Sequence, residues 1–216
     1  MHDAFDGSRL SVRPPTRGVF EGAHEGVIMR LGFVVNPIAG MGGRVGLKGT
    51  DDKVEEARAR GAEPRSPARA RRALDAIFEQ LPAATLVTWG EPMGAGLARE
   101  AGFDPEVLGV PEGTETTAAD TRAAVDAFLD AGVDLICFVG GDGTAADVAE
   151  ALDGSDVPML GIPGGVKVYS SVFAVSPEDA ADVLASFERT ERREVLDIDE
   201  DAYREGSVDP ELRAVA

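Results

Sequence analysis

The chain has few of the residues on which zinc sites and histidine-dependent active sites rely. Of its 216 residues, one is cysteine and two are histidine. His2 and His24 both precede the first hydrophobic segment. Zinc sites need several cysteine or histidine ligands, and catalytic triads need a histidine base. The sequence therefore argues against both classes. Cys137 excludes an internal disulfide, and its place within an apolar run predicts a buried, inert thiol.

Long hydrophobic runs are also missing from the sequence. No segment approaches the roughly 20 apolar residues of a membrane-spanning helix, and the N-terminus lacks the apolar centre of a signal peptide. We therefore expect a cytoplasmic protein with no membrane partner.

Lysine is scarce and acidic residues are abundant. The lysines are Lys48, Lys53 and Lys167, and the formal net charge is −18. Such a charge disfavours nucleic acid and anionic membranes as partners. Many carboxylates with few lysines favour adaptation to high salt, where screening reduces self-repulsion. An acidic protein from a GC-rich genome is the alternative interpretation.

The most informative segment is an apolar run followed by a glycine-rich turn. Leu135–Val139 is typical of a parallel strand buried on both faces, and Gly140-Gly-Asp-Gly-Thr144 follows it. Thr144 and Asp147 have capping-box spacing, which predicts a helix from about Ala145. Glycines before a helix favour phosphate. A carboxylate there suits Mg²⁺ binding or proton removal from a hydroxyl, so Asp142 favours phosphoryl transfer to an alcohol. A tight turn capped by Asp142 is an equally weighted alternative.

A second glycine-rich turn follows the predicted strand Leu31–Val35. Its sequence is Asn36-Pro-Ile-Ala-Gly-Met-Gly-Gly-Arg44. The glycines could cradle phosphate, with Asn36 and Arg44 as polar contacts and Lys48 as a nearby cation. The turn lacks the Gly-Lys-Ser/Thr ending of a P-loop. Glycines that only turn the chain are the alternative.

Two further groups of residues are predicted at the same edge of a sheet. Thr116, Thr117 and Asp120 begin a helix; a capping role explains them, and this interpretation is slightly favoured over ligand binding. Lys167 follows Pro163-Gly-Gly165, where it is either a phosphate contact or an exposed charge. We interpret Gly90–Gly96 as a simple turn.

Strand-like and helix-like segments alternate along the chain, which predicts an α/β fold with a doubly wound, mostly parallel sheet. Residues 1–30 are expected to be a disordered tail or an over-called start, residues 31–190 a nucleotide-binding domain, and residues 191–216 the start of a truncated C-terminal region. The predicted strands are 31–35, 85–89, 107–110, 135–139, 158–162 and 194–198. The predicted helices begin near residues 54, 66, 97, 117, 145 and 176.

Three segments together resemble the ATP-NAD kinases. They are residues 36–50, residues 140–144 and Gly161-Ile-Pro-Gly-Gly-Val-Lys167, in the order expected of the family. The resemblance spans about residues 31–206 and is greatest for the archaeal, acetoin-catabolism-protein-X-like branch. Gly-Gly-Asp-Gly-Thr alone is shared with diacylglycerol, sphingosine and 6-phosphofructo kinases, so it indicates only a superfamily.

The resemblance implies an NAD kinase / phosphofructokinase-like N-terminal domain. It would transfer the γ-phosphoryl group of ATP, or of polyphosphate, to the 2′-hydroxyl of NAD, with Mg²⁺ as a further cofactor and no metal ligand assigned. Asp142 would orient or deprotonate the hydroxyl. The nucleotide-binding residues implied by the resemblance would be Asn36, Gly40, Gly42, Gly43, Gly141, Gly143 and Thr144. Gly140, Thr117, Asp120 and Lys167 are further candidates from their predicted place at the same edge of the sheet.

Two departures from the family pattern bear on activity. The C-terminal β domain, which would supply much of the NAD site and a homo-oligomer contact, is expected to be missing, and the usual Asn-Glu pair is not found. The chain could then be an inactive fragment. A different small-alcohol or lipid kinase and a non-catalytic nucleotide-binding module are the other hypotheses.

Overall fold

The computed structural model describes residues 28–40, 63–165, 167–186, 190–191, 193–198 and 210–215. Several sequence predictions lie outside these residues: the tail before residue 28, the helix near residues 54–60, and the contacts assigned to Gly42, Gly43, Arg44 and Lys48.

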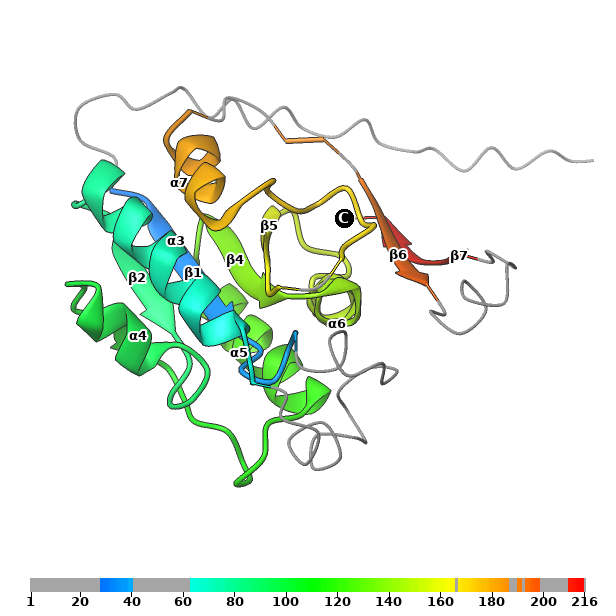
Figure 1. Ribbon diagram of the computed structural model, residues 1–216, viewed down its shortest axis with the longest axis horizontal. Coiled ribbons are helices and arrows are strands. Elements are labelled where there is room, and N and C mark those ends of the chain that lie inside the picture. The colour runs from blue at the N-terminus through cyan, green and yellow to red at the C-terminus, as the bar shows by residue number, and fades with distance from the viewer. Residues whose placement is uncertain are drawn as a thin grey trace, which may run out of the picture.

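The described residues form a five-stranded parallel sheet, as the alternating pattern predicted (Figure 1). Its spatial order is β3-β2-β1-β4-β5, with every pairing parallel. The chain moves outward from β1 to β3 and then crosses to β4 on the other side of β1. The order therefore reverses between β1 and β4, and such a switch point is where open α/β sheets bind ligands. The strands are β1 (Arg30–Val35), β2 (Thr85–Thr88), β3 (Glu106–Val107), β4 (Leu135–Gly140) and β5 (Met159–Pro163).

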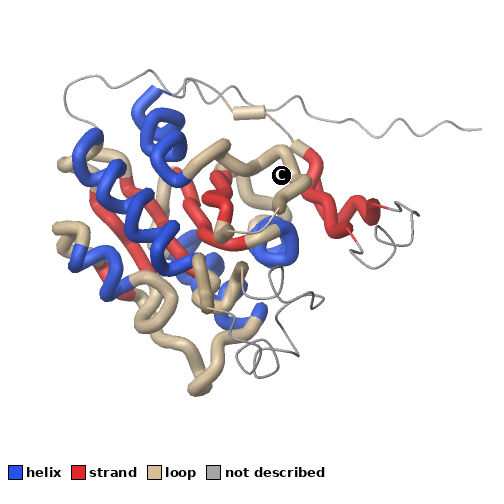
Figure 2. Tube along the Cα trace, viewed as in Figure 1, coloured by secondary structure: helices blue, strands red, loops and turns tan. Residues whose placement is uncertain are grey.

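Helices cover both faces of this sheet (Figure 2). The chain forms α3 (Ser66–Gln80), α4 (Ala95–Glu100), α5 (Ala118–Asp130), α6 (Asp142–Ala151) and α7 (Pro177–Ser186). Buried residues of α3, α4 and α7 share one hydrophobic cluster, and those of α5 and α6 share the other. The sheet is thus the middle layer of three.

Alternation along the strands explains the two clusters. Leu31, Phe33 and Val35 of β1 lie in the first cluster, and Val34 lies in the second, because successive side chains of a strand point to opposite faces. All six residues of β4 are buried. Cys137 is fully buried on this strand, and burial raises the pKa of its thiol well above its ordinary value. These features agree with the inert thiol expected from the sequence.

One predicted helix start is wrong. Helix α6 begins at Asp142 with Gly141 as its N-cap, so Thr144 lies inside the first turn and does not form a capping box with Asp147. A Cβ at Gly140 would collide with the Thr144 side chain, so glycine allows the strand to enter the helix this early. Helix α3 begins at Ser66, as predicted, with Arg65 as its N-cap.

The end of the described chain forms a small second sheet. Strands β6 (Glu194–Ile198) and β7 (Pro210–Val215) pair antiparallel, and both contact α6. Strand β6 was predicted and β7 was not, because Pro210-Glu-Leu-Arg-Ala-Val215 carries two charges and little β-branched content. No helix within the described ranges is long and apolar enough to cross a membrane.

Candidate functional site

Glycine-rich turns gather where the parallel strands end. The turn after β1 adjoins β4, because the Asn36 N–H donates to the Val139 carbonyl at 2.9 Å. The turn after β5 adjoins it from the other side, because the Gly164 N–H donates to the Gly140 carbonyl at 2.7 Å. We call residues 36–40, 140–144 and 163–165 the rim turns. They lie side by side across the switch point of the sheet.

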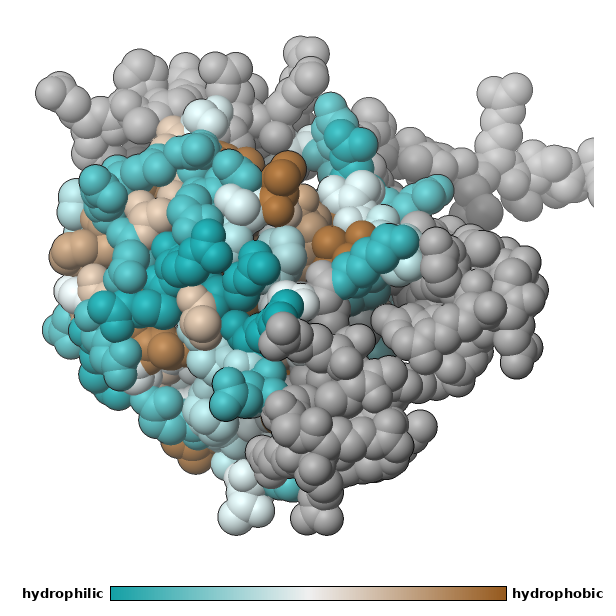
Figure 3. Space-filling model, viewed as in Figure 1, coloured by the Kyte–Doolittle hydropathy of each residue, from teal (hydrophilic) through white to brown (hydrophobic). Residues whose placement is uncertain are grey.

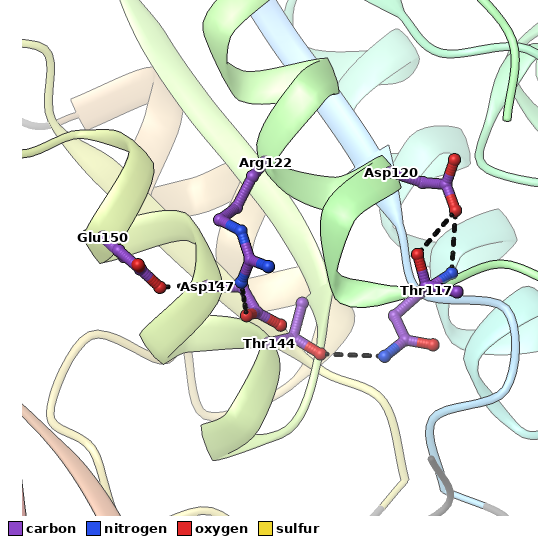
Figure 4. A network of polar contacts seen from close by, with 7 residues as sticks. Thr117, Asp120, Arg122, Thr144, Asp147 and Glu150 are labelled. Carbon is purple, nitrogen blue, oxygen red and sulfur yellow. Dashed lines mark hydrogen bonds and ion pairs between the residues drawn. The ribbon is translucent and has the colours of Figure 1, made fainter. Parts of the chain in front are cut away.

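Asn36 joins the first two rim turns through its side chain. Its Nδ2 donates to Thr144 Oγ1 at 3.1 Å, and its Oδ1 accepts the Ile38 N–H at 3.2 Å. Thr144 is 5% exposed and points out of the first turn of α6 (Figure 4). The Asn36 amide therefore fixes the turn after β1 against the start of α6.

A close backbone contact explains why residue 40 of the rim turns is glycine. Gly40 has φ +89°, and a Cβ there would lie 2.6 Å from the Gly164 carbonyl oxygen. Ser66 Oγ lies beneath both turns, 2.8 Å from the Ala39 carbonyl and 3.4 Å from the Gly164 carbonyl. By contrast, a Cβ at Gly143 would meet no described residue within 4 Å. The turns are thus packed against one another, while no described residue fills the space beside Gly143.

Asp142 is the first residue of α6 and is half-buried. Its Oδ1 accepts the N–H of Ser170 at 2.8 Å and the Ser170 hydroxyl at 2.6 Å, and its Oδ2 accepts the Tyr169 N–H at 2.9 Å. These donors come from the segment that follows the turn after β5. The structure therefore holds the carboxylate beside the rim turns at a helix start, where negative charge is favoured.

Thr117 and Asp120 form the predicted capping box at the start of α5. The Asp120 carboxylate accepts hydrogen bonds from the N–H and hydroxyl of Thr117 and from the Glu112 N–H (Figure 4). Burial alone would raise the pKa of this carboxyl, but these hydrogen bonds together hold the pKa below its ordinary value. The capping role, slightly favoured from the sequence, accounts for the contacts with Thr117, and the bond from the Glu112 N–H also ties the preceding loop to the helix start.

Asp147 faces Arg122 of the neighbouring helix instead of capping α6. Arg122 Nη1 lies 2.7 Å from Asp147 Oδ1 and 3.5 Å from Glu150 Oε2 (Figure 4). This ion pair ties α5 to α6 below the rim.

Lys167 is exposed, and its Nζ lies 4.5 Å from the centroid of the Tyr169 ring. The segment that carries Lys167 therefore also supplies the donors to Asp142.

Arg65 lies at the rim and was not singled out from the sequence. A Cβ on Gly165 would lie 2.7 Å from Arg65 Cβ and 2.9 Å from its Cδ, so the arginine stem crosses this turn. The first turn of α3 carries no acidic residue. Arg71 and Arg72 of the same helix pair with carboxylates, whereas Arg65 has no ion pair with any described residue. The chain is strongly acidic, and the Arg65 guanidinium has no ion pair among the described residues. Because it lies beside glycine-rich turns of the kind that bind phosphate, Arg65 is a candidate phosphate-binding residue.

Two other residues of the site were also missed. Tyr169 and Ser170 contact Asp142 although they lie 27 and 28 residues further along the sequence. No local spacing rule links them, because the contact depends on the path of the chain after β5. Arg65 had a weak signal: arginine beside the helix start Ser66-Pro67 in a chain with little positive charge.

The described residues provide no ready-made metal cage. No group of three or more histidine, cysteine, aspartate or glutamate side chains among them could hold an ion. Mg²⁺ commonly takes one or two carboxylates together with substrate phosphates, and Asp142 beside the rim turns fits that mode.

Comparison with known proteins gives one match. Residues 31–192 match the family model for the ATP-NAD kinase N-terminal domain. Neither the curated proteins nor the solved structures gave a significant match. The matched residues include every described rim turn and Asp142.

Proposed function

The chain belongs to the ATP-NAD kinase family, and on that basis we propose that it transfers the terminal phosphoryl group of ATP, or of polyphosphate, to the 2′-hydroxyl of NAD, giving NADP. The observation that carries the proposal is the place of Asp142. It begins a helix directly after the central strand β4, with the turns of β1 and β5 packed on either side.

In the proposed reaction, the rim turns bind the phosphates of the donor. Backbone N–H groups at the start of α6 point out of the helix without intrahelical partners, and such groups bind anions. Gly143 leaves space beside them, and Arg65 adds a positive charge. This local charge matters because the chain as a whole carries −18 and repels polyphosphates.

In the proposed reaction, the Asp142 carboxylate accepts the proton of the 2′-hydroxyl. In the proposed step, the 2′-hydroxyl oxygen forms a bond to the γ-phosphorus while its proton passes to the Asp142 carboxylate. The bond from the γ-phosphorus to the bridging oxygen breaks, and its electrons leave with the diphosphate portion of the donor. Positioning and charge neutralisation dominate such transfers. Mg²⁺ would be held together with the donor phosphates at the rim turns beside Asp142, and it would supply neutralisation of phosphate charge.

The test is phosphorylation of NAD by the full chain with ATP and Mg²⁺, or with polyphosphate and Mg²⁺, at low and at high salt. Formation of NADP is measured with an NADP-specific dehydrogenase. Asp142→Asn should lower kcat by about a hundredfold or more, which is the scale of a general base. Asp126→Asn, at an exposed position of α5, is the matched control and should leave kcat unchanged.

Three results would contradict the proposal in different ways. Phosphorylation of another alcohol but not of NAD would indicate a different kinase of the same superfamily. Nucleotide binding without turnover would indicate a binding module. A wild-type rate in Asp142→Asn would remove the carboxylate from the mechanism.

A further inference from the structure

We infer that Ser170 is a positioning residue for Asp142 and that Oδ2, rather than Oδ1, is the carboxylate oxygen that takes the proton. The inference rests on the proposed function for its chemistry, and on the hydrogen bonds of Asp142 for its geometry. It concerns the segment after β5, to which the sequence assigned no site residue beyond Lys167.

The hydrogen bonds to the two carboxylate oxygens are unequal. Oδ1 accepts both the N–H and the hydroxyl of Ser170, whereas Oδ2 accepts the Tyr169 N–H. A carboxylate has about four acceptor positions, two on each oxygen. Among the described residues, Oδ1 is therefore saturated and Oδ2 keeps one position. That position is the one open to a substrate hydroxyl.

Ser170 is well placed to keep both acceptor positions of Oδ1 occupied. Its side chain is 5% exposed, and its O–H···O⁻ distance of 2.6 Å is in the range of strong charge-assisted hydrogen bonds. The segment that carries it is anchored to β5, because the Gly161 N–H donates to the Val172 carbonyl and the Ala174 N–H donates to the Gly161 carbonyl. The serine is thus fixed to the sheet and in turn fixes the carboxylate.

This arrangement gives the two oxygens separate roles. When the ribose hydroxyl oxygen attacks the γ-phosphorus, its proton goes to Oδ2. Ser170 keeps its own proton and continues to donate to Oδ1. Without the serine hydroxyl, the backbone N–H groups of Tyr169 and Ser170 still hold the carboxylate. Oδ1 then regains one acceptor position, so the substrate hydroxyl is no longer directed to Oδ2 alone. The effect should fall on the rate of transfer and not on substrate affinity.

Ser170→Ala is the direct test, in the full chain with NAD, ATP and Mg²⁺. We expect kcat to fall about tenfold, the loss expected for one hydrogen bond to a charged group, with KM for both substrates within about twofold. Ser170→Thr keeps the hydroxyl and should recover most of the rate. Ser176→Ala is the matched control, because that serine accepts the Asp179 N–H at the start of α7; it should leave kcat unchanged.

A second readout does not depend on activity. Amide protons that donate to a carboxylate resonate downfield, so Asp142→Asn should move the Tyr169 and Ser170 amide signals upfield in a ¹H–¹⁵N spectrum. Wild-type kcat in Ser170→Ala, or unmoved amide signals in Asp142→Asn, would overturn the inference. If the wild-type chain fails to phosphorylate NAD while those amide signals move, the proposed function fails and the positioning contact stands.

Discussion

A side-chain hydrogen bond joins the turn after β1 to the start of α6, although its two residues are 108 positions apart in the sequence. The bond from Asn36 to Thr144 spans the switch point between β1 and β4. Both residues were predicted to contact nucleotide, but the spacing of Thr144 and Asp147 suggested a cap. Because Gly140 lets the helix start early, Thr144 faces Asn36 instead. The capping prediction failed because the partner of Thr144 is distant in sequence, and the nucleotide contacts of Asn36 and Thr144 stay a prediction.

Asp120 offers a residue-scale prediction of stability against pH. Its folded-state pKa lies below its ordinary value, so its stabilising effect is present above the unfolded pKa of about 3.9 and is lost as pH falls. Asp120→Asn should lower the free energy of unfolding by about 2 kcal/mol at neutral pH. The difference from wild type should shrink below about pH 4.

Urea denaturation at pH 7 and at pH 3.5 measures this difference. Asp126→Asn, at an exposed position of the same helix, is the control. An equal loss of stability for Asp120→Asn at both pH values would show that the carboxylate charge is not the source of the stabilisation.

Helix α3 shows what periodicity reveals about an element and what it omits. Ala70, Ala73, Leu74 and Ile77 recur at helical spacing and are fully buried. Phe78 has the same spacing but is 36% exposed, and its ring meets Phe103 edge-on at 5.0 Å. The first turn of α3 has a second role that periodicity does not encode, because Ser66 and Arg65 contact the rim turns.

Arg65 gives the element-scale prediction. Arg65→Ala should raise KM for ATP about fivefold, because an exposed charged contact contributes roughly 1 kcal/mol, and should leave KM for NAD unchanged. Arg99→Ala is the control: it also removes one exposed positive charge that has no ion pair among the described residues, but from the last turn of α4. Steady-state kinetics with each substrate varied in turn make the comparison. If both substitutions raised KM for ATP equally, Arg65 would act only through the net charge of the chain and not through a direct contact with ATP.

At the scale of the whole molecule, the alternating pattern was sufficient to predict the parallel sheet and its helices. Strand direction places every loop after a strand at the same edge, so the gathering of the rim turns followed from the sequence. Strand β7 did not, because its pairing with β6 satisfies the backbone whatever its side-chain pattern. The contacts of Asp142 with residues 169–170 also depended on the path of the chain through space.

The charge of the molecule predicts how its stability responds to salt. The visible face is mostly hydrophilic (Figure 3), and the net charge is −18. Raising KCl from 0.1 M to 1 M shortens the screening length from about 10 Å to about 3 Å and weakens repulsion between carboxylates. The midpoint of thermal unfolding should rise by about 5 °C, which corresponds to 1–2 kcal/mol. Differential scanning calorimetry across the salt series measures the shift, and an unchanged or falling midpoint would contradict adaptation to high salt.

The central claim is that the loops at one edge of the sheet together hold a polyphosphate beside Asp142. The most direct measurement is a map of backbone amide shifts as MgATP is added to the ¹⁵N-labelled chain. Our account predicts that the largest shifts fall in residues 38–40, 141–144 and 164–165, and that they diminish in Arg65→Ala. Shifts concentrated at the opposite edge, around the turns before β1, β2 and β4, would contradict it.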